Sequence, residues 1–137
     1  MKYFFSYIWA IVWGIIMLTL LLLPPNELPD VRKYELFAGI DKVVHMGIFF
    51  VLAILLYWEC AMKSKWKGNM WIIVSKVVIS TVIFALFTEE AQKHVSSRTA
   101  DLYDIYADCI GIGMATFSFL LLYRGNKAKK NEEIYTN

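Results

Sequence analysis

Charged residues are scarce in this chain, and their scarcity excludes several classes of protein. Of 137 residues, 19% are charged and 58% are hydrophobic, whereas soluble domains average about 25% charged and about 45–50% apolar residues. The chain is too apolar for an ordinary soluble fold, and disorder or a collagen-like structure is excluded as the main state. The net charge is only +2, so no basic surface of the kind that binds nucleic acid is expected. At this length we expect a single domain.

Cysteine and familiar catalytic spacings are also rare or missing. Cys60 and Cys109 are the two cysteines, and the hydrophobic pattern separates them too widely for a disulfide. The chain has no H-E-x-x-H spacing, no evident Ser/His/Asp order and no internal repeat. No sequence motif therefore identifies a metal, a cofactor or a reaction.

Long apolar segments dominate the rest of the sequence. A membrane-spanning helix needs about 20 mostly apolar residues. Four runs approach this length, at residues 4–23, 43–62, 70–87 and 102–123. They do not alternate as barrel strands do, and backbone in lipid must pair internally. The sequence predicts an all-α membrane protein, with a bundle of four transmembrane helices over residues 1–123.

The distribution of lysine predicts how this bundle is oriented. The loop Lys63-Ser-Lys-Trp-Lys67 contains three lysines and no acid, and positive loops stay on the cytoplasmic side. We therefore expect both termini in the cytoplasm, and residues 24–42 and 88–101 outside. The first apolar run ends in Pro24-Pro25 rather than at a small-residue cleavage site, so we expect it to remain as a helix. Residues 124–137 should form a polar cytoplasmic tail, disordered or near anionic headgroups.

Aromatic residues and isolated charges fit this orientation. Five aromatic residues are expected in a belt at the cytoplasmic boundary: Tyr57, Trp58, Trp66, Trp71 and Tyr123. Trp9 and Trp13 do not fit the belt, and we expect them to pack between helices. Glu59 and Glu90 should be solvated or close to the headgroups, and Lys76 should extend toward the cytoplasm.

Ionisable residues at membrane depth are costly and are functional candidates by default. One group opens the second helix, where Asp41 and His45 are four residues apart and share a helix face, with Lys42 beside them. A second group begins with Glu89 and Gln92, which are three apart. It continues through Arg98, Asp101, Asp104 and Asp108. Both groups fall at the predicted outer face.

The last three acids form one helical stripe that continues into small residues. Asp101, Asp104 and Asp108 are spaced three and four apart, and the stripe then reaches Gly111 and Ala115. Small residues let helices approach closely. We therefore expect this face of the fourth helix to point into the bundle rather than toward lipid.

Taken in order, these residues resemble the pattern of the VanZ-like membrane proteins. That family has D-K-x-x-H at the start of one helix, later T-E-x-x-Q, an arginine, and an aspartate followed four residues on by asparagine or aspartate, then glycines. Here the pattern reads Asp41-Lys42-x-x-His45, Thr88-Glu89-x-x-Gln92, Arg98, Asp104, Asp108 and Gly111. The resemblance covers roughly residues 24–115. It departs at Asp108, where asparagine is common, and at Ala115, where a second glycine is common.

The resemblance implies a multi-pass protein of the bacterial plasma membrane with a connection to the cell envelope. The name-giving member is associated with low-level resistance to the glycopeptide teicoplanin, and the family has no assigned reaction. We expect an outward-facing polar pocket that binds or acts on envelope precursors or anionic lipids. The residues expected to line it are Asp41, Lys42, His45, Glu89, Gln92, Arg98, Asp104 and Asp108.

Structural explanations compete with this functional one. Asp41 and Asp101 are suited to capping helices, His45 to packing, and Asp104 and Asp108 to hydrogen bonds between helices. Three function classes therefore remain open. The chain is a catalyst that uses histidine and carboxylates, with or without a metal, or a binding or transport protein in which Arg98 and Lys42 hold phosphate. The third class is a structural protein whose polar cluster holds the helices together. Transport by so small a bundle would require a homodimer.

Overall fold

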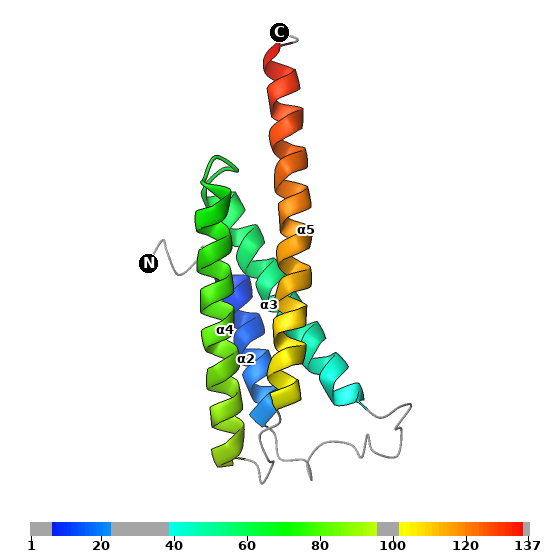
Figure 1. Ribbon diagram of the computed structural model, residues 1–137. Helices are drawn as coiled ribbons and strands as arrows, with labels where there is room; N and C mark the ends of the chain where they lie inside the picture. Colours follow the sequence, from blue (N-terminus) through cyan, green and yellow to red (C-terminus); the bar gives the residue numbers. More distant parts are fainter. Residues whose placement is uncertain (1–6, 23–38, 96–101, 136–137) are drawn as a thin grey trace.

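The described part of the chain forms four α-helices, and successive helices run in opposite directions (Figure 1). The computed structural model describes residues 7–22, 39–95 and 102–135. The helices are α2 (Ile8–Leu22), α3 (Ile40–Lys63), α4 (Met70–Val95) and α5 (Leu102–Tyr135). Because the directions alternate, the end of α4 and the starts of α3 and α5 lie at one end of the bundle (Figure 1).

Three of these helices are long and apolar enough to cross a membrane. The qualifying segments are Ile40–Lys63, Met70–His94 and Leu102–Asn126. At 15 residues, α2 extends only about 22 Å at 1.5 Å per residue, less than the roughly 30 Å of a bilayer core. The prediction of an all-helical fold is confirmed, as are three helices of membrane-spanning length. The first predicted span, 4–23, reaches beyond the described residues at both ends.

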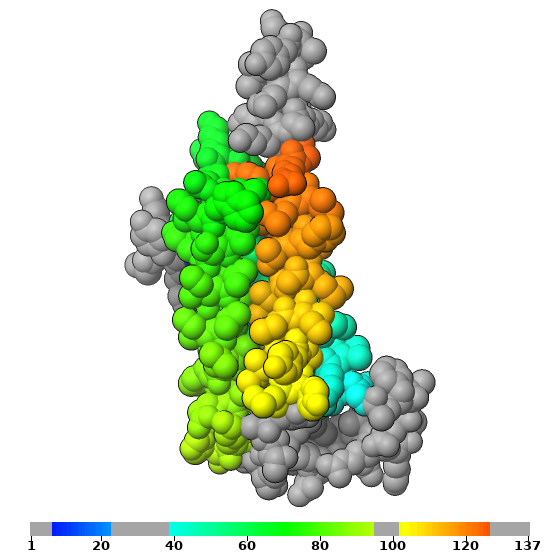
Figure 2. All heavy atoms as spheres, viewed as in Figure 1, coloured from blue at the N-terminus to red at the C-terminus, as the bar shows by residue number. Residues whose placement is uncertain are grey.

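The outer surface of the bundle is apolar along α4 and α5, which lie side by side (Figure 2). On α4 the exposed side chains include Ile79, Ile83 and Phe87, and on α5 they include Phe117 and Leu121. Soluble monomers rarely expose apolar patches this extensive. Such a surface is compatible with lipid acyl chains, in agreement with the apolar composition.

Several helices extend further than the hydrophobic runs predicted. The α3 helix begins at Ile40, and α4 continues to Val95, so Glu89 and Gln92 lie on its last turns rather than in a connecting segment. The α5 helix continues to Tyr135, so most of 124–137 is helical rather than disordered. The alternative expectation, that this polar tail lies near anionic headgroups, stays a prediction. Hydropathy locates the part of a helix that suits lipid, whereas lysine and glutamate beyond it still favour helical backbone.

The closest helix contact lies between α3 and α5. A Cβ atom on Gly111 would lie only 2.2 Å from the backbone oxygen of Met46. One turn along α5, Ala115 is completely buried. The predicted small-residue stripe does point into the bundle, and Gly111 is the point of closest approach.

Only some of the aromatic residues predicted for the belt are exposed. Tyr57 is buried, stacks on Phe119 with ring centroids 4.3 Å apart, and shares a 2.9 Å hydrogen bond with Thr116 Oγ1. Tyr123 is also buried, and its hydroxyl donates to the backbone oxygens of the α3–α4 loop. Both residues belong to the core rather than to a belt, because each is buried and its hydroxyl has a hydrogen-bond partner within the protein. Trp58 and Trp71 are exposed, as a belt requires.

Two further predictions concerned the tryptophans of α2. Trp13 does pack between helices, and its Nε1–H donates to the backbone oxygen of Ile48 at 3.0 Å. Trp9 is exposed, so the prediction that it packs between helices is wrong.

Glu59 is buried, contrary to the expectation that it is solvated. Its Oε1 accepts the backbone N–H groups of Trp9 at 2.9 Å and Ala10 at 3.3 Å. These groups belong to the first turn of α2, whose N–H groups have no partner within the helix. The carboxylate of α3 therefore caps α2, and desolvation of the charge is offset by two charge-assisted hydrogen bonds.

Candidate functional site

The end of α4 and the starts of α3 and α5 lie at one end of the bundle (Figure 1), and polar side chains of these three helices gather there. We refer to them as the polar cluster: Asp41, Lys42 and His45 from α3, Glu89 and Gln92 from α4, and Asp104 and Asp108 from α5. The helical spacing explains why each pair on one helix faces the same way, since residues three or four apart are neighbours on the helix surface. All seven residues come from the predicted site.

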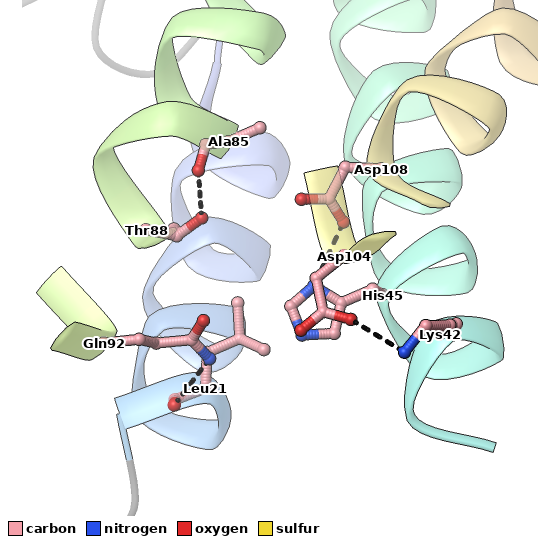
Figure 3. A network of polar contacts seen from close by, with 8 residues as sticks. All are labelled: Leu21, Lys42, His45, Ala85, Thr88, Gln92, Asp104 and Asp108. Atoms are coloured by element: carbon pink, nitrogen blue, oxygen red, sulfur yellow. Dashed lines mark hydrogen bonds and ion pairs between the residues drawn. The ribbon is translucent and has the colours of Figure 1, made fainter. Parts of the chain in front are cut away.

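A hydrogen-bonded pair of His45 and Asp108 lies deepest in the cluster. His45 Nδ1 is 3.1 Å from Asp108 Oδ1, and the two side chains are 1% and 0% exposed (Figure 3). With Asp108 ionised, its carboxylate can only accept, and Nδ1 of His45 carries the proton and donates. The other ring nitrogen, Nε2, is buried and has no hydrogen-bond partner within the described structure. Asp108 thereby fixes both the orientation and the tautomer of the ring.

Asp104 lies one turn before Asp108, near the start of α5, and pairs with Lys42. Lys42 Nζ is 3.7 Å from Asp104 Oδ1 (Figure 3), and 5.7 Å from the centre of the Tyr103 ring. The Asp104 side chain is largely buried, whereas that of Lys42 is 40% exposed. Lys42 therefore lies at the edge of the cluster, where its charge is accessible from outside the bundle.

Asp41 lies in the first turn of α3 rather than at its N-cap. The N-cap is Gly39, whose φ of 105° favours glycine, and no side-chain cap is found there among the described residues. The interpretation of Asp41 as the N-cap residue is therefore wrong, although its charge still complements the helix dipole. Asp41, His45 and Asp104 each offer one metal-ligand atom, and these atoms all lie within 4.8 Å of one another.

The two α4 residues contribute in different ways. Glu89 is 4% exposed and interacts electrostatically with Asp104, His45 and Asp108. Its Oε1 has no hydrogen-bond partner in the described part of the chain. Gln92 instead reaches α2, where its Nε2 donates to the backbone oxygen of Leu21 at 3.1 Å (Figure 3). That oxygen belongs to the last turn of α2, where backbone oxygens have no hydrogen-bond partner within the helix itself.

The remaining predicted residues lie elsewhere. Arg98, and Asp101 as a helix cap, lie outside the described residues. Glu90 is exposed and pairs with Lys93 at 2.8 Å, in agreement with its expected solvation. Lys76 is exposed on α4. Glu59 is the residue that the sequence-based reasoning missed, and a carboxylate within an apolar helix was itself the signal that it needed a partner.

An apolar cavity lies further along the bundle from the polar cluster. It has a volume of about 340 Å³ and is lined by residues of α2, α3 and α4 that include Leu18, Leu52 and Phe84. Leu52 follows His45 by two turns of α3, which corresponds to about 10 Å. The bundle therefore combines a polar cluster at one end with an apolar cavity nearer its middle.

Comparisons with known proteins give little that identifies the chain. No protein-family profile matches it, and no solved structure matches it. Over 84 residues it is 30% identical to a protein of the fission yeast Schizosaccharomyces pombe described as "Uncharacterized protein C11E3.10". The match covers 61% of this chain and 49% of the yeast protein, so the chain spans about half of that relative's length. The similarity assigns neither a family nor an activity.

Proposed function

We propose that this chain is a multi-pass membrane protein, similar to the VanZ-like proteins, whose polar cluster binds a phosphate-bearing lipid or lipid-linked envelope precursor. The observation that carries the proposal is the buried His45–Asp108 pair beside Lys42 and Asp104, at the end of three apolar helices. Ionisable groups are expensive in such a bundle. A phosphate group at the edge of the cluster gives Lys42 a ligand to hold.

The arrangement supports a lipid rather than a free anion. Lys42 is partly exposed at the end of the bundle, at the level where headgroups meet the ends of membrane-spanning helices. Lys42 lies in the first turn of α3, where the positive end of the helix dipole favours anions. The apolar cavity lined by Leu52 and Phe84 has room for part of an acyl chain. One molecule with a phosphate head and an apolar tail would satisfy both regions.

The proposal includes the membrane topology. The predicted span 4–23, of which α2 is the described part, would form a fourth transmembrane helix, with both termini in the cytoplasm and the polar cluster at the outer face. The resemblance to VanZ-like proteins favours the bacterial plasma membrane and a link to glycopeptide resistance. Transport of a phosphate-bearing lipid would additionally require a homodimer.

A second candidate function is catalysis on the same lipid. The Asp108 carboxylate orients His45 as it would a general base, with Nε2 as the reacting nitrogen. The bracing alternative is supported by Gln92 and Glu59, which do join helices. Bracing does not account for His45 Nε2 and Glu89 Oε1, which are buried without hydrogen-bond partners in the described structure.

The test compares two lysines at the same end of the bundle. The full-length chain, purified in detergent, is titrated with mixed micelles that contain either phosphatidic acid or diacylglycerol, which has the same acyl chains without the phosphate, and binding is followed by tryptophan fluorescence. Lys42→Met should weaken binding of phosphatidic acid by about tenfold or more, because a hydrogen bond to a charged group contributes about 1.5–3 kcal/mol. Lys93→Met, which removes an exposed lysine paired with Glu90, should bind as the wild type does. Equal affinities for the two variants, or no preference for phosphatidic acid, would contradict the proposal.

A further inference from the structure

We propose that Asp41, His45 and Asp104 bind a divalent metal ion, and that Asp108 positions His45 for this purpose. The role of the ion in holding a lipid phosphate rests on the proposed function above. Metal binding itself depends only on side chains of this chain, and it can be measured without lipid.

The geometry of the three donors fits an ion with little rearrangement. Their ligand atoms all lie within 4.8 Å of one another. Metal–ligand bonds of about 2.0–2.2 Å place two ligand atoms about 3.3–3.6 Å apart at a tetrahedral zinc ion, and at most about 4.0–4.4 Å apart across an octahedral ion. Side-chain movement of about 0.5–1.5 Å would close the difference. Asp41 and His45 share one face of α3, and Asp104 approaches from α5, so the ion would also link two helices.

The state of His45 is an independent observation that points to a ligand. Its ring is 1% exposed, and Nε2 has no hydrogen-bond partner among the described residues. Nδ1 donates to Asp108, while the Asp104 carboxylate lies beside the ring (Figure 3). Histidine ligands of metals commonly donate their second ring nitrogen to a carboxylate in this way, which leaves a lone pair on the metal-facing nitrogen. Asp108 occupies the position of that carboxylate.

The charges around the three donors also favour a cation. Four carboxyl groups meet here, on Asp41, Glu89, Asp104 and Asp108, and Lys42 is at ion-pair distance from one of them. A divalent ion would neutralise much of this negative charge in an apolar setting. One imidazole and two carboxylates suit zinc or manganese better than magnesium or calcium, which prefer oxygen donors alone. Glu89, whose Oε1 is buried without a hydrogen-bond partner in the described structure, is available as a further oxygen donor.

The second histidine of the chain supplies a matched control. His94 lies on the same end of α4, but its side chain is 73% exposed. The full-length chain in detergent is stripped with chelator and titrated with zinc against a chromophoric competitor. We expect one zinc per chain, a loss of affinity of about tenfold or more in His45→Ala, and wild-type affinity in His94→Ala. Asp108→Asn should weaken binding by about 10–100-fold, with the metal-free melting temperature close to that of the wild type.

Melting temperatures with zinc and X-ray absorption provide two further tests of the metal site. Zinc should raise the melting temperature of the wild type and of His94→Ala but not that of His45→Ala. If His45→Ala does not fold, Asp41→Asn replaces it, because Asp41 is only partly buried. Equal zinc affinity in the wild type and either ligand variant would overturn the proposal. So would X-ray absorption that shows sulfur ligands, since these would come from Cys60 or Cys109.

Lys42→Met distinguishes the proposed metal site from the proposed lipid-binding function. It removes a positive charge that competes at Asp104, so zinc affinity should stay the same or rise, while binding of phosphatidic acid falls. A protein that binds phosphatidic acid but not zinc would refute only the metal site. A protein that binds zinc but shows no preference for phosphatidic acid would refute only the lipid function.

Discussion

Replacing Gly111 by alanine should separate α3 from α5 at the polar cluster. The new Cβ would lie 2.2 Å from the backbone oxygen of Met46 and 3.1 Å from the nitrogen of Phe50. Carbon–oxygen contacts normally need about 3.3 Å, so the helices must move apart by about 1 Å. Because the clash is with backbone, no side-chain rotation relieves it. Overpacking of this kind costs about 1–3 kcal/mol of unfolding free energy.

The same helix provides the control for this prediction. Gly113 lies two residues further on, and a Cβ atom there would meet nothing within 4 Å. Gly113→Ala should therefore raise the free energy of unfolding by up to about 1 kcal/mol, the helix-propensity gain of alanine over glycine. Chemical denaturation in detergent, followed by circular dichroism, measures both variants. Gly111→Ala should be the less stable of the two by about 2 kcal/mol or more.

Gly111→Ala should also disturb the site. His45 precedes Met46 in α3, and Asp108 lies one turn before Gly111, so a shift of about 1 Å lengthens their 3.1 Å hydrogen bond. Zinc and phosphatidic acid affinity should both fall in this variant but not in Gly113→Ala. Equal stability of the two alanine variants would show that α3 and α5 do not pack as described. Asp104 and Asp108 would then not lie beside His45, and the polar cluster would not form as described.

Two further predictions concern the capping contact and the topology. Glu59→Ala should lower the free energy of unfolding by about 1–2 kcal/mol, because the N–H groups of Trp9 and Ala10 lose their acceptor. Glu59→Gln should lower it by less, since an amide oxygen still accepts a hydrogen bond. Equal losses in the two variants would contradict the capping role of Glu59. In a background without native cysteines, a cysteine at position 93 should react with a membrane-impermeant thiol reagent in intact cells, and one at position 65 should not. The reverse labelling would put the polar cluster in the cytoplasm.

The sequence predicted the parts of this fold that depend on apolar periodicity. Three long helices and the inward-facing stripe from Asp104 to Ala115 follow from residue spacing and hydropathy. Helix ends were less predictable. Lys93 and Glu90 form an exposed ion pair on a continuing helix, and hydropathy alone cannot distinguish such a segment from a loop.

The candidate site was predicted residue by residue, but its geometry was not. The sequence grouped Asp41 with His45 by spacing, and only the packing of α5 on α3 brings Asp104 and Asp108 to them. Gln92 was grouped with this pocket, yet the contact described for it is with α2. The roles of Gln92 and Glu59 depend on where α2 begins and ends, because each bonds a backbone group that the helix leaves without a partner.

The central claim is that the polar cluster binds a ligand rather than only bracing the bundle, and Asp104→Asn tests it most directly. The amide keeps the shape of the side chain and removes its charge. Phosphatidic acid affinity, zinc affinity and melting temperature are measured on one preparation of this variant. We predict that zinc affinity falls by about tenfold or more while the metal-free melting temperature stays near that of the wild type, because a ligand charge is lost and the packing is not. A melting temperature that falls while zinc and lipid affinities stay unchanged would contradict the account and support bracing.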